Sequence, residues 1–200
     1  MTTKTVEYFL SPVSPYVYLG HARFVELARA QGATVVIKPM DLARVFPATG
    51  GLPLAKRAPQ RQAYRLVELA RWGAFLNVPI IPQPAYFPCP ADLASKWVIA
   101  AADEDPARAL AFIGAIGLAL WAEQRNPDDR ETLAALAAAS GLNANAIRLQ
   151  ADSAEVAARY DALTVEAVEH GVFGAPTYAY RGELFWGQDR LDFLARALAQ

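Results

Sequence analysis

The pair Ser14-Pro15 lies where a strand-like pattern gives way to a helical one. Serine is a favoured helix N-cap, and proline is well tolerated at the first helical position. A helix start carries partial positive charge and free N–H groups that favour an anion. We therefore expect Ser14 to activate a thiol brought by a ligand, with simple capping as the open alternative. Ser11-Pro12 is a rival, but it falls against the end of the strand.

The chain has one cysteine, Cys89, and so it has no Cys-x-x-Cys pair at the Ser14 corner. Disulfide exchange requires an attacking thiolate, which a serine cannot supply. Cys89 lies between two prolines and is interpreted as a structural thiol. His21 and His170 fall on predicted helices without partners at metal-ligand spacing, so no metal site is predicted.

A second segment with chemical potential is the glycine-rich turn at residues 171–177, which contains Ala175-Pro176. An X-Pro bond adopts the cis form at a cost of only about 0.5–1 kcal/mol. A cis bond here would present the backbone N–H and C=O of Ala175 to an extended peptide. The alternative is an ordinary trans proline at the start of a strand.

A third segment, residues 185–190, precedes the last predicted helix and contains Gln188 and Asp189. Backbone N–H groups at a helix start can bind a carboxylate, and the Asp189 side chain can pair with an amine. Together they suit the amino-acid end of a γ-glutamyl group. The alternative is that Asp189 is only a favourable charge near a helix start.

The elements that position these segments follow a recognisable order. Strands are predicted at residues 5–10 and 34–38 around a helix at 15–31. Strands at 177–180 and 183–186 precede a final helix that opens at 187–189. A loop at 46–59 and several helices, one starting at Asn126-Pro127, lie between.

This order predicts an α/β, thioredoxin-like fold with β-α-β and β-β-α halves and an inserted all-helical domain. The thioredoxin-like domain takes residues 1–45 and 172–200. The helical insertion takes residues 46–171, including the helix that leads back.

Composition narrows the class of protein. The 200 residues include 19 Lys and Arg against 20 Asp and Glu, which leaves no electrostatic footprint for nucleic acid or an anionic membrane. No charge-free apolar run approaches the roughly 20 residues of a membrane span, and no signal peptide is recognised. We expect a soluble cytoplasmic protein. The hydrophobic fraction of 54% predicts a buried subunit interface, as in a homodimer.

Taken together, these segments resemble the 2-hydroxychromene-2-carboxylate isomerase family, which is related to kappa-class glutathione transferases and DsbA-like proteins. The resemblance covers the whole chain. It rests on Ser14-Pro15-Tyr16, Asp-Leu-Ala-Arg-Val at 41–45, Ala-Arg-Trp at 70–72, Val-Phe-Gly-x-Pro-Thr at 172–177 and Trp-Gly-x-Asp-Arg-Leu at 186–191.

The resemblance implies a glutathione cofactor. Arg61, three residues before Tyr64 on the first inserted helix, is the implied partner of the glycine end. Relatives often have an asparagine after the glycines of the preceding loop, where this chain reads Gly50-Gly51-Leu52-Pro53. The other implied contacts are Ser14 at the sulfur, Ala175 and Pro176 at the cysteinyl backbone, and Gln188 and Asp189 at the γ-glutamyl end.

The implied activity is reversible thiol addition to a small aromatic oxo acid, interconverting 2-hydroxychromene-2-carboxylate and trans-o-hydroxybenzylidenepyruvate or a related intermediate of aromatic degradation. Two alternatives remain open: a kappa-like glutathione transferase that releases stable conjugates, and a redox-inactive DsbA-like peptide-binding protein. The aromatic side chains expected around the substrate, each of which can equally be core, are Tyr16, Tyr64, Trp72, Tyr86 and Phe87.

Overall fold

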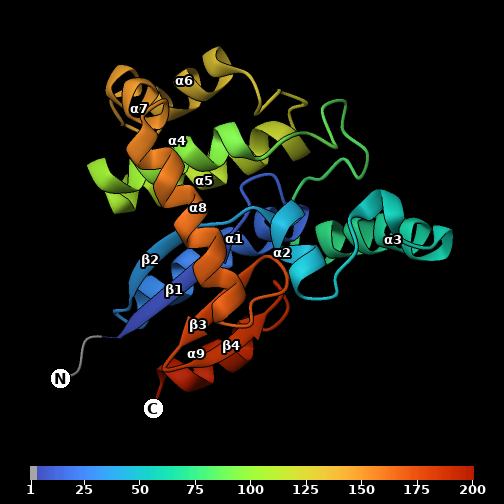
Figure 1. Cartoon of the computed structure of the whole chain (residues 1–200). Helices are drawn as coiled ribbons and strands as arrows, with labels where there is room; N and C mark the ends of the chain where they lie inside the picture. The colour runs from blue at the N-terminus through green and yellow to red at the C-terminus, as the bar shows by residue number, and fades with distance from the viewer. Residues whose placement is uncertain (1–3) are drawn as a thin grey trace.

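A four-stranded mixed sheet forms the centre of the computed structural model, which describes residues 4–200 (Figure 1). The strand order is β2-β1-β3-β4. Strand β1 (Thr5–Leu10) runs parallel to β2 (Thr34–Pro39) and antiparallel to β3 (Thr177–Tyr180). Strand β4 (Glu183–Trp186) pairs antiparallel with β3. The pairing confirms the predicted β-α-β and β-β-α halves, which meet at β1 and β3.

Helices cover the sheet and continue beyond it. No helix within residues 4–200 combines the length and the apolar character that crossing a bilayer needs. The helices are α1 (Pro15–Ala30), α2 (Leu42–Ala48), α3 (Pro59–Leu76), α4 (Asp92–Glu104), α5 (Pro106–Trp121), α6 (Arg130–Ala139), α7 (Ala144–Ala151), α8 (Ala154–Glu169) and α9 (Leu191–Leu198), with a short 3-10 helix at Leu54–Lys56.

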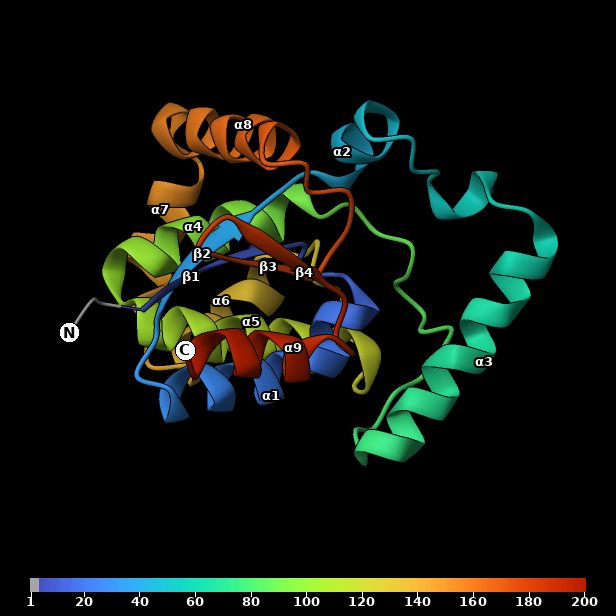
Figure 2. The same ribbon diagram turned by 90° about the horizontal axis from the view of Figure 1, so that it is seen from below.

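The sheet is sandwiched between helices, with α1 and α9 on one face and α8 on the other (Figure 2). Alternation along β1 explains both faces, because successive strand residues point to opposite sides. Tyr8 and Leu10 join the core with α1 and α9, whereas Phe9 packs with Ala167 of α8. Both faces are therefore buried.

The inserted helices share the largest core cluster with the sheet. Trp97 of α4 and Phe112 of α5 belong to the same buried cluster as Tyr8 of β1 and Phe24 of α1. Tertiary contacts join α5 to α1 and α4 to β2. The apolar packing is continuous across residues 45 and 172. The division of the chain into two domains at these residues therefore stays a prediction.

Two helix starts differ from the sequence expectation. The expected loop at 46–59 contains the end of α2 and the 3-10 helix. Asp41 caps α2 by accepting from the Ala43 N–H at 2.8 Å, and the helix packs on α8. Helix α6 starts at Arg130 because Asp129 caps it. Asn126 instead accepts from the Asp128 N–H in a local turn.

His21 is held neutral inside the core. Its Nε2 lies 2.7 Å from the Leu110 carbonyl oxygen, which can only accept, so Nε2 carries the proton. Nδ1 then accepts from the Tyr8 hydroxyl at 3.2 Å. Burial lowers the pKa of His21 to about 4, although the bond to Leu110 opposes the shift.

This burial predicts an acid-dependent loss of stability. A histidine with a folded pKa of about 4 and an unfolded value near 6.5 contributes stability at neutral pH, which is lost as pH falls between those values. We expect the free energy of unfolding to drop by about 3 kcal/mol from this group between pH 7 and pH 4. Urea unfolding of the wild type and of His21→Gln measures it, and equal pH slopes in both proteins would contradict it.

Candidate functional site

Ser14 stands at the N-terminus of α1 and is 8% exposed. Its Oγ accepts from the Val17 N–H at 3.4 Å, and Pro15 is the first helical residue. Capping uses a lone pair of the hydroxyl and leaves its proton available. The rival Ser11 is only 2% exposed, and its carbonyl accepts from the Ser14 N–H at 2.9 Å. Capping and activation of a thiol are therefore compatible at Ser14.

The Ala175-Pro176 turn precedes β3. Its peptide bond is cis, as expected for this fold. Within the described part of the chain, no backbone hydrogen bond involves Ala175. The Pro176 carbonyl accepts from the Gly187 N–H at 2.9 Å, which ties this turn to the segment before α9. Ala175 thus offers a free backbone donor and acceptor to an extended ligand.

Gln188 and Asp189 lie before α9, which begins only at Leu191. The expectation that α9 opens at 187–189 is therefore wrong, because a turn in which the Arg190 N–H donates to the Gly187 carbonyl at 3.3 Å comes first. Among residues 4–200, the N–H groups of Gln188 and Asp189 make no backbone hydrogen bond. The Asp189 carboxylate pairs with Arg190 at 2.7 Å.

Helix α1 holds this segment directly. Arg23, which sequence reasoning missed, donates from Nη2 to the backbone oxygen of Gln188 at 2.8 Å and also to its side-chain oxygen. A Cβ placed at Gly20 would lie only 2.7 Å from the Cβ of Gln188. The absence of a side chain at Gly20 lets the segment and α1 meet, so that the starts of two helices converge.

Charges on three separate segments act on Tyr16 of α1. Burial raises the pKa of Tyr16, while Arg65 of α3 lowers it and Glu68 raises it. Arg57, just after the 3-10 helix, and Asp189 are also close enough to act on it. The region around Tyr16 therefore joins α1, α3, the segment before α3 and the segment before α9.

Arg65 is the least expected member of this region, because it is a charged residue that is only 9% exposed. Its guanidinium lies 5.0 Å from the Phe87 ring and 5.7 Å from the Trp121 ring. Trp121 in turn donates from Nε1 to the Val13 carbonyl at 3.3 Å, next to Ser14. The sequence does indicate that Arg65 is buried, because it precedes Leu69 by one turn on the apolar stripe of α3.

The predicted aromatic residues divide into two groups. Tyr16, Trp72 and Phe87 pack against one buried cluster, formed by Val13, Leu19, Leu69, Leu120 and Trp121. Tyr64 and Tyr86 are 58% and 45% exposed and lie outside this cluster.

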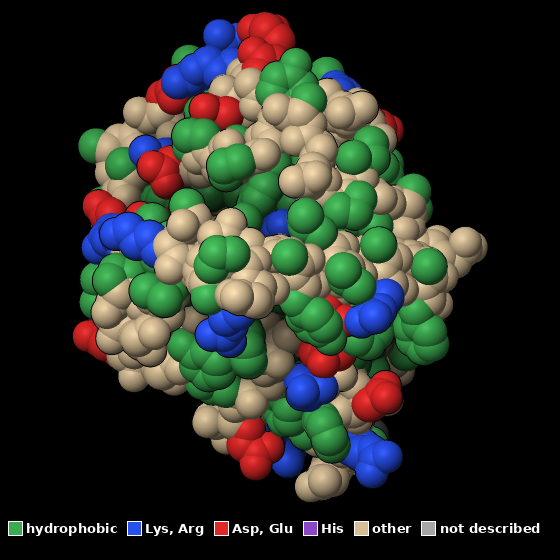
Figure 3. Space-filling view, turned by 90° about the vertical axis from the view of Figure 1, so that its right-hand side faces the viewer, with side chains coloured by type: hydrophobic (Ala, Val, Ile, Leu, Met, Phe, Trp, Pro, Cys, Tyr) green, Lys and Arg blue, Asp and Glu red, His purple; other side chains and the backbone are tan. Residues whose placement is uncertain are grey.

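Arg61 is exposed and is not among the charges that act on Tyr16. Its contact with a glycine carboxylate therefore stays a prediction. Figure 3 shows the face that carries α3, where hydrophobic side chains surround a recess in which Lys or Arg atoms are visible.

Residues 5–199 match the family described as DSBA-like thioredoxin domain. A 2-hydroxychromene-2-carboxylate isomerase from Sphingobium xenophagum is 32% identical over 196 residues, covering 96% of each chain. One from Pseudomonas putida is 29% identical, covering 98% of this chain and 94% of that one. This chain belongs to the 2-hydroxychromene-2-carboxylate isomerase family.

Solved structures agree with the family assignment. A structure of 2-hydroxychromene-2-carboxylate isomerase superposes with a TM-score of 0.84 at 30% identity, covering 98% of this chain and 94% of that one. The cytosolic disulfide reductase DsbM from Pseudomonas aeruginosa, solved with GSH, has a TM-score of 0.70 at 18% identity, covering 98% and 100%. At that identity the likeness concerns the fold alone.

The single cysteine of this family member is not a reactive thiol. Burial raises the pKa of Cys89 to about 11, so the thiol is protonated at neutral pH. Cys89 packs against the cluster beside Trp121. Its environment agrees with the interpretation of Cys89 as a structural thiol.

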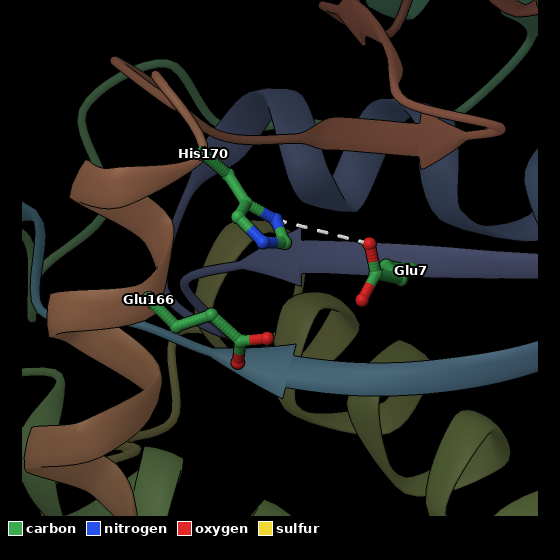
Figure 4. A group of neighbouring side chains, drawn as sticks. All are labelled: Glu7, Glu166 and His170. Carbon is green, nitrogen blue, oxygen red and sulfur yellow. Dashed lines mark ion pairs between the residues drawn. The ribbon is translucent and has the colours of Figure 1, made fainter.

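A second polar cluster lies on the α8 face of the sheet, where Glu7, Glu166 and His170 approach one another (Figure 4). Their potential ligand atoms lie within 4.8 Å of one another, which sequence spacing did not reveal. Lys38 already supplies a cation here, since its Nζ donates to Glu166 at 2.6 Å and also to Glu7. The cluster ties α8 to β1 and β2.

The contact at Gly20 yields a prediction for the isomerase site. Gly20→Ala gains helix propensity of about 1 kcal/mol, but its methyl group collides with Gln188. We expect a net loss of about 1–2 kcal/mol in unfolding free energy, measured by urea titration. Gly114→Ala, whose Cβ meets its nearest atom at 3.3 Å, is the control. A Gly20→Ala variant as stable as the wild type would contradict the prediction.

Proposed function

We propose that this protein is a glutathione-dependent isomerase that interconverts 2-hydroxychromene-2-carboxylate and trans-o-hydroxybenzylidenepyruvate, or a closely related aromatic oxo acid. The observation that carries the proposal is the Ser14 hydroxyl, which caps α1 and keeps a free proton beside unpaired backbone groups. The relatives at 29–32% identity, all named 2-hydroxychromene-2-carboxylate isomerase, support the reaction class.

The residues present fit a γ-glutamyl tripeptide. Ala175 has a free N–H and C=O, which an extended cysteinyl backbone would pair with. The free N–H groups of Gln188 and Asp189 suit the α-carboxylate of the γ-glutamyl end. The Asp189 side chain suits the α-amine, in competition with its present partner Arg190.

Ser14 and α1 would prepare the ligand thiol for reaction. The positive end of the α1 dipole favours an anion at this position, and the Ser14 hydroxyl donates a hydrogen bond to the thiolate. Both effects lower the thiol pKa and raise the population of the nucleophile near neutral pH. Glutathione held by Ala175, Gln188 and Asp189 would supply a thiolate nucleophile for reversible addition to the conjugated double bond of the substrate.

The aromatic side chains near Ser14 suit the substrate ring. Tyr16 follows Ser14 by two residues, and Phe87 packs against Trp121 in a tilted arrangement with ring centroids 4.7 Å apart. Tyr16, Trp72 and Phe87 surround the same apolar cluster. A planar aromatic substrate would bury its rings against them.

Ser14 variants test the proposal. Ser14→Ala is expected to lower kcat/KM roughly 100-fold and to raise the pKa of the bound glutathione thiol, because one donor to the thiolate is lost. Turnover is followed by substrate absorbance, and thiolate formation by absorbance in the far ultraviolet.

Two further variants serve as controls. Ser14→Asn keeps a good N-cap but has no hydroxyl, so it should retain stability and still lose activity. Ser11→Ala should retain activity. If Ser14→Ala kept full turnover while Ser11→Ala lost it, the assignment of the activating serine would be wrong.

The products distinguish this proposal from its two rivals. An isomerase returns free glutathione at its starting concentration, whereas a transferase accumulates a conjugate with a chlorodinitrobenzene-type acceptor. A peptide-binding protein of this fold would show no saturable glutathione binding by calorimetry. Accumulation of a conjugate, or the absence of saturable glutathione binding, would contradict isomerisation.

The proposal includes a homodimer in the cytoplasm, where glutathione keeps thiols reduced. Helix α3 supports the dimer, because it stands to one side of the sheet and carries exposed apolar side chains (Figure 2). Phe75 is 78% exposed and Val67 is 45% exposed. A second copy of the chain would bury this apolar face.

Light scattering after gel filtration measures the assembly. The wild type is expected at twice the mass of one chain, and Phe75→Glu should shift it to one chain because it places a charge on the apolar face. Leu149→Glu on α7 is the matched control, since Leu149 is equally exposed at 78%. A monomeric wild type would disprove the dimer.

A further inference from the structure

Arg65 carries a buried charge that nothing in the described chain neutralises. It is 9% exposed, and burial lowers the pKa of its guanidinium. Among residues 4–200, no carboxylate forms an ion pair with it, and the titratable groups that act on its pKa are Tyr16 and Arg57. The nearby acid Glu68 lies 3.4 Å from Arg71 instead. Burying an unpaired cation is costly unless a partner is supplied.

Aromatic rings compensate only part of this cost. Phe87 and Trp121 contact the guanidinium through their faces, which attract a cation. The five N–H donors in the plane of the group still need acceptors. The Nε atom of Arg23 is fully buried and has no hydrogen-bond partner, whereas no nitrogen of Arg65 is in that position. The donors of Arg65 therefore remain accessible to a ligand.

The position of Arg65 connects it with Ser14. Arg65 lies over Trp121, and the Trp121 indole donates to the carbonyl of Val13, the residue before Ser14. The charge of Arg65 also lowers the pKa of Tyr16, which lies two residues after Ser14. A ligand that reaches from the Ser14 hydroxyl toward α3 would meet a cation set among aromatic rings.

We propose that Arg65 binds the carboxylate of the aromatic oxo-acid substrate through its guanidinium fork. This inference rests on the proposed function and names the residue that orients its substrate. The surroundings favour an acid that carries a ring, because the aromatic side chains of Phe87 and Trp121 lie beside the charge. An anchored carboxylate would hold the conjugated double bond in one orientation toward Ser14.

The glycine carboxylate of glutathione is the other source of the same chemistry. Arg61 lies one turn before Arg65 on α3, is exposed, and is the residue implied for that contact. A glycine residue has no ring that could pack against Phe87 and Trp121, which flank Arg65. We therefore assign Arg65 to the substrate, and the experiment separates the two sources.

Calorimetric titration with phenylpyruvate, an unreactive aromatic oxo acid, tests the anchor without turnover. We expect Arg65→Met to weaken binding roughly 10- to 100-fold, because a charged hydrogen-bond pair is lost. Arg65→Lys should bind with intermediate affinity, since it keeps the charge and loses the fork. Arg71→Met, an exposed arginine of the same helix, is the matched control and should bind as the wild type does.

A measurement on the wild type alone guards against misfolded variants. The methyl ester of phenylpyruvate keeps the ring and removes the charge, so it should bind more weakly than the acid by a similar factor. Arg65→Met should not discriminate between acid and ester. Equal affinity of the wild type for acid and ester would overturn the inference.

Glutathione titration separates the remaining outcomes. Arg65→Met should bind glutathione as the wild type does. If its glutathione affinity fell while its phenylpyruvate affinity held, Arg65 would serve the tripeptide and the inference would be wrong. If the wild type bound phenylpyruvate through Arg65 but did not bind glutathione, the anchor would stand and the proposed function would fail.

Discussion

The antiparallel pairing of β1 with β3 is the constraint on which the site depends. Phe9 pairs with Thr177, so the end of β1 lies beside the start of β3. Ser14 follows β1 and Ala175 precedes β3, which places residues from the two ends of the chain at one edge of the sheet. The Gly187 N–H then bonds to the Pro176 carbonyl and brings in the segment before α9. One strand pairing therefore assembles three separate segments.

The N-terminus of a helix offers free N–H groups and partial positive charge whatever side chain caps it. The free N–H groups and the dipole of α1 favour an anion next to Ser14, and they do so without any sulfur in the protein. Cys89 is buried with a raised pKa and lies elsewhere. The fold thus keeps the electrostatic environment of an anionic sulfur, while Ser14 offers only a hydroxyl. This division suits a protein that handles a thiol belonging to its ligand.

Helix α3 adds what the thioredoxin-like sheet lacks. It brings Arg65 and aromatic side chains over the start of α1, where Trp121 of α5 supports both Arg65 and the Val13 carbonyl. The combination of a buried cation, apolar walls and a free hydroxyl favours a ligand with a ring and a charge. Arg65 differs in this respect from Lys38 on the other side of the fold, whose charge is neutralised by Glu7 and Glu166.

Local chemistry made most of the framework predictable from sequence: Ser14 as the cap of α1 and the strands depend on residues close together in the chain. The packing of α2 on α8 and the burial of Arg65 depend on tertiary contacts. Arg65 becomes buried only where α3 packs it against Phe87 and Trp121. The sequence by itself determined the order of the main helices and strands and the cap of α1. Only the tertiary structure decided which distant side chains share one environment, because burial and charge pairing depend on packing rather than on local conformation.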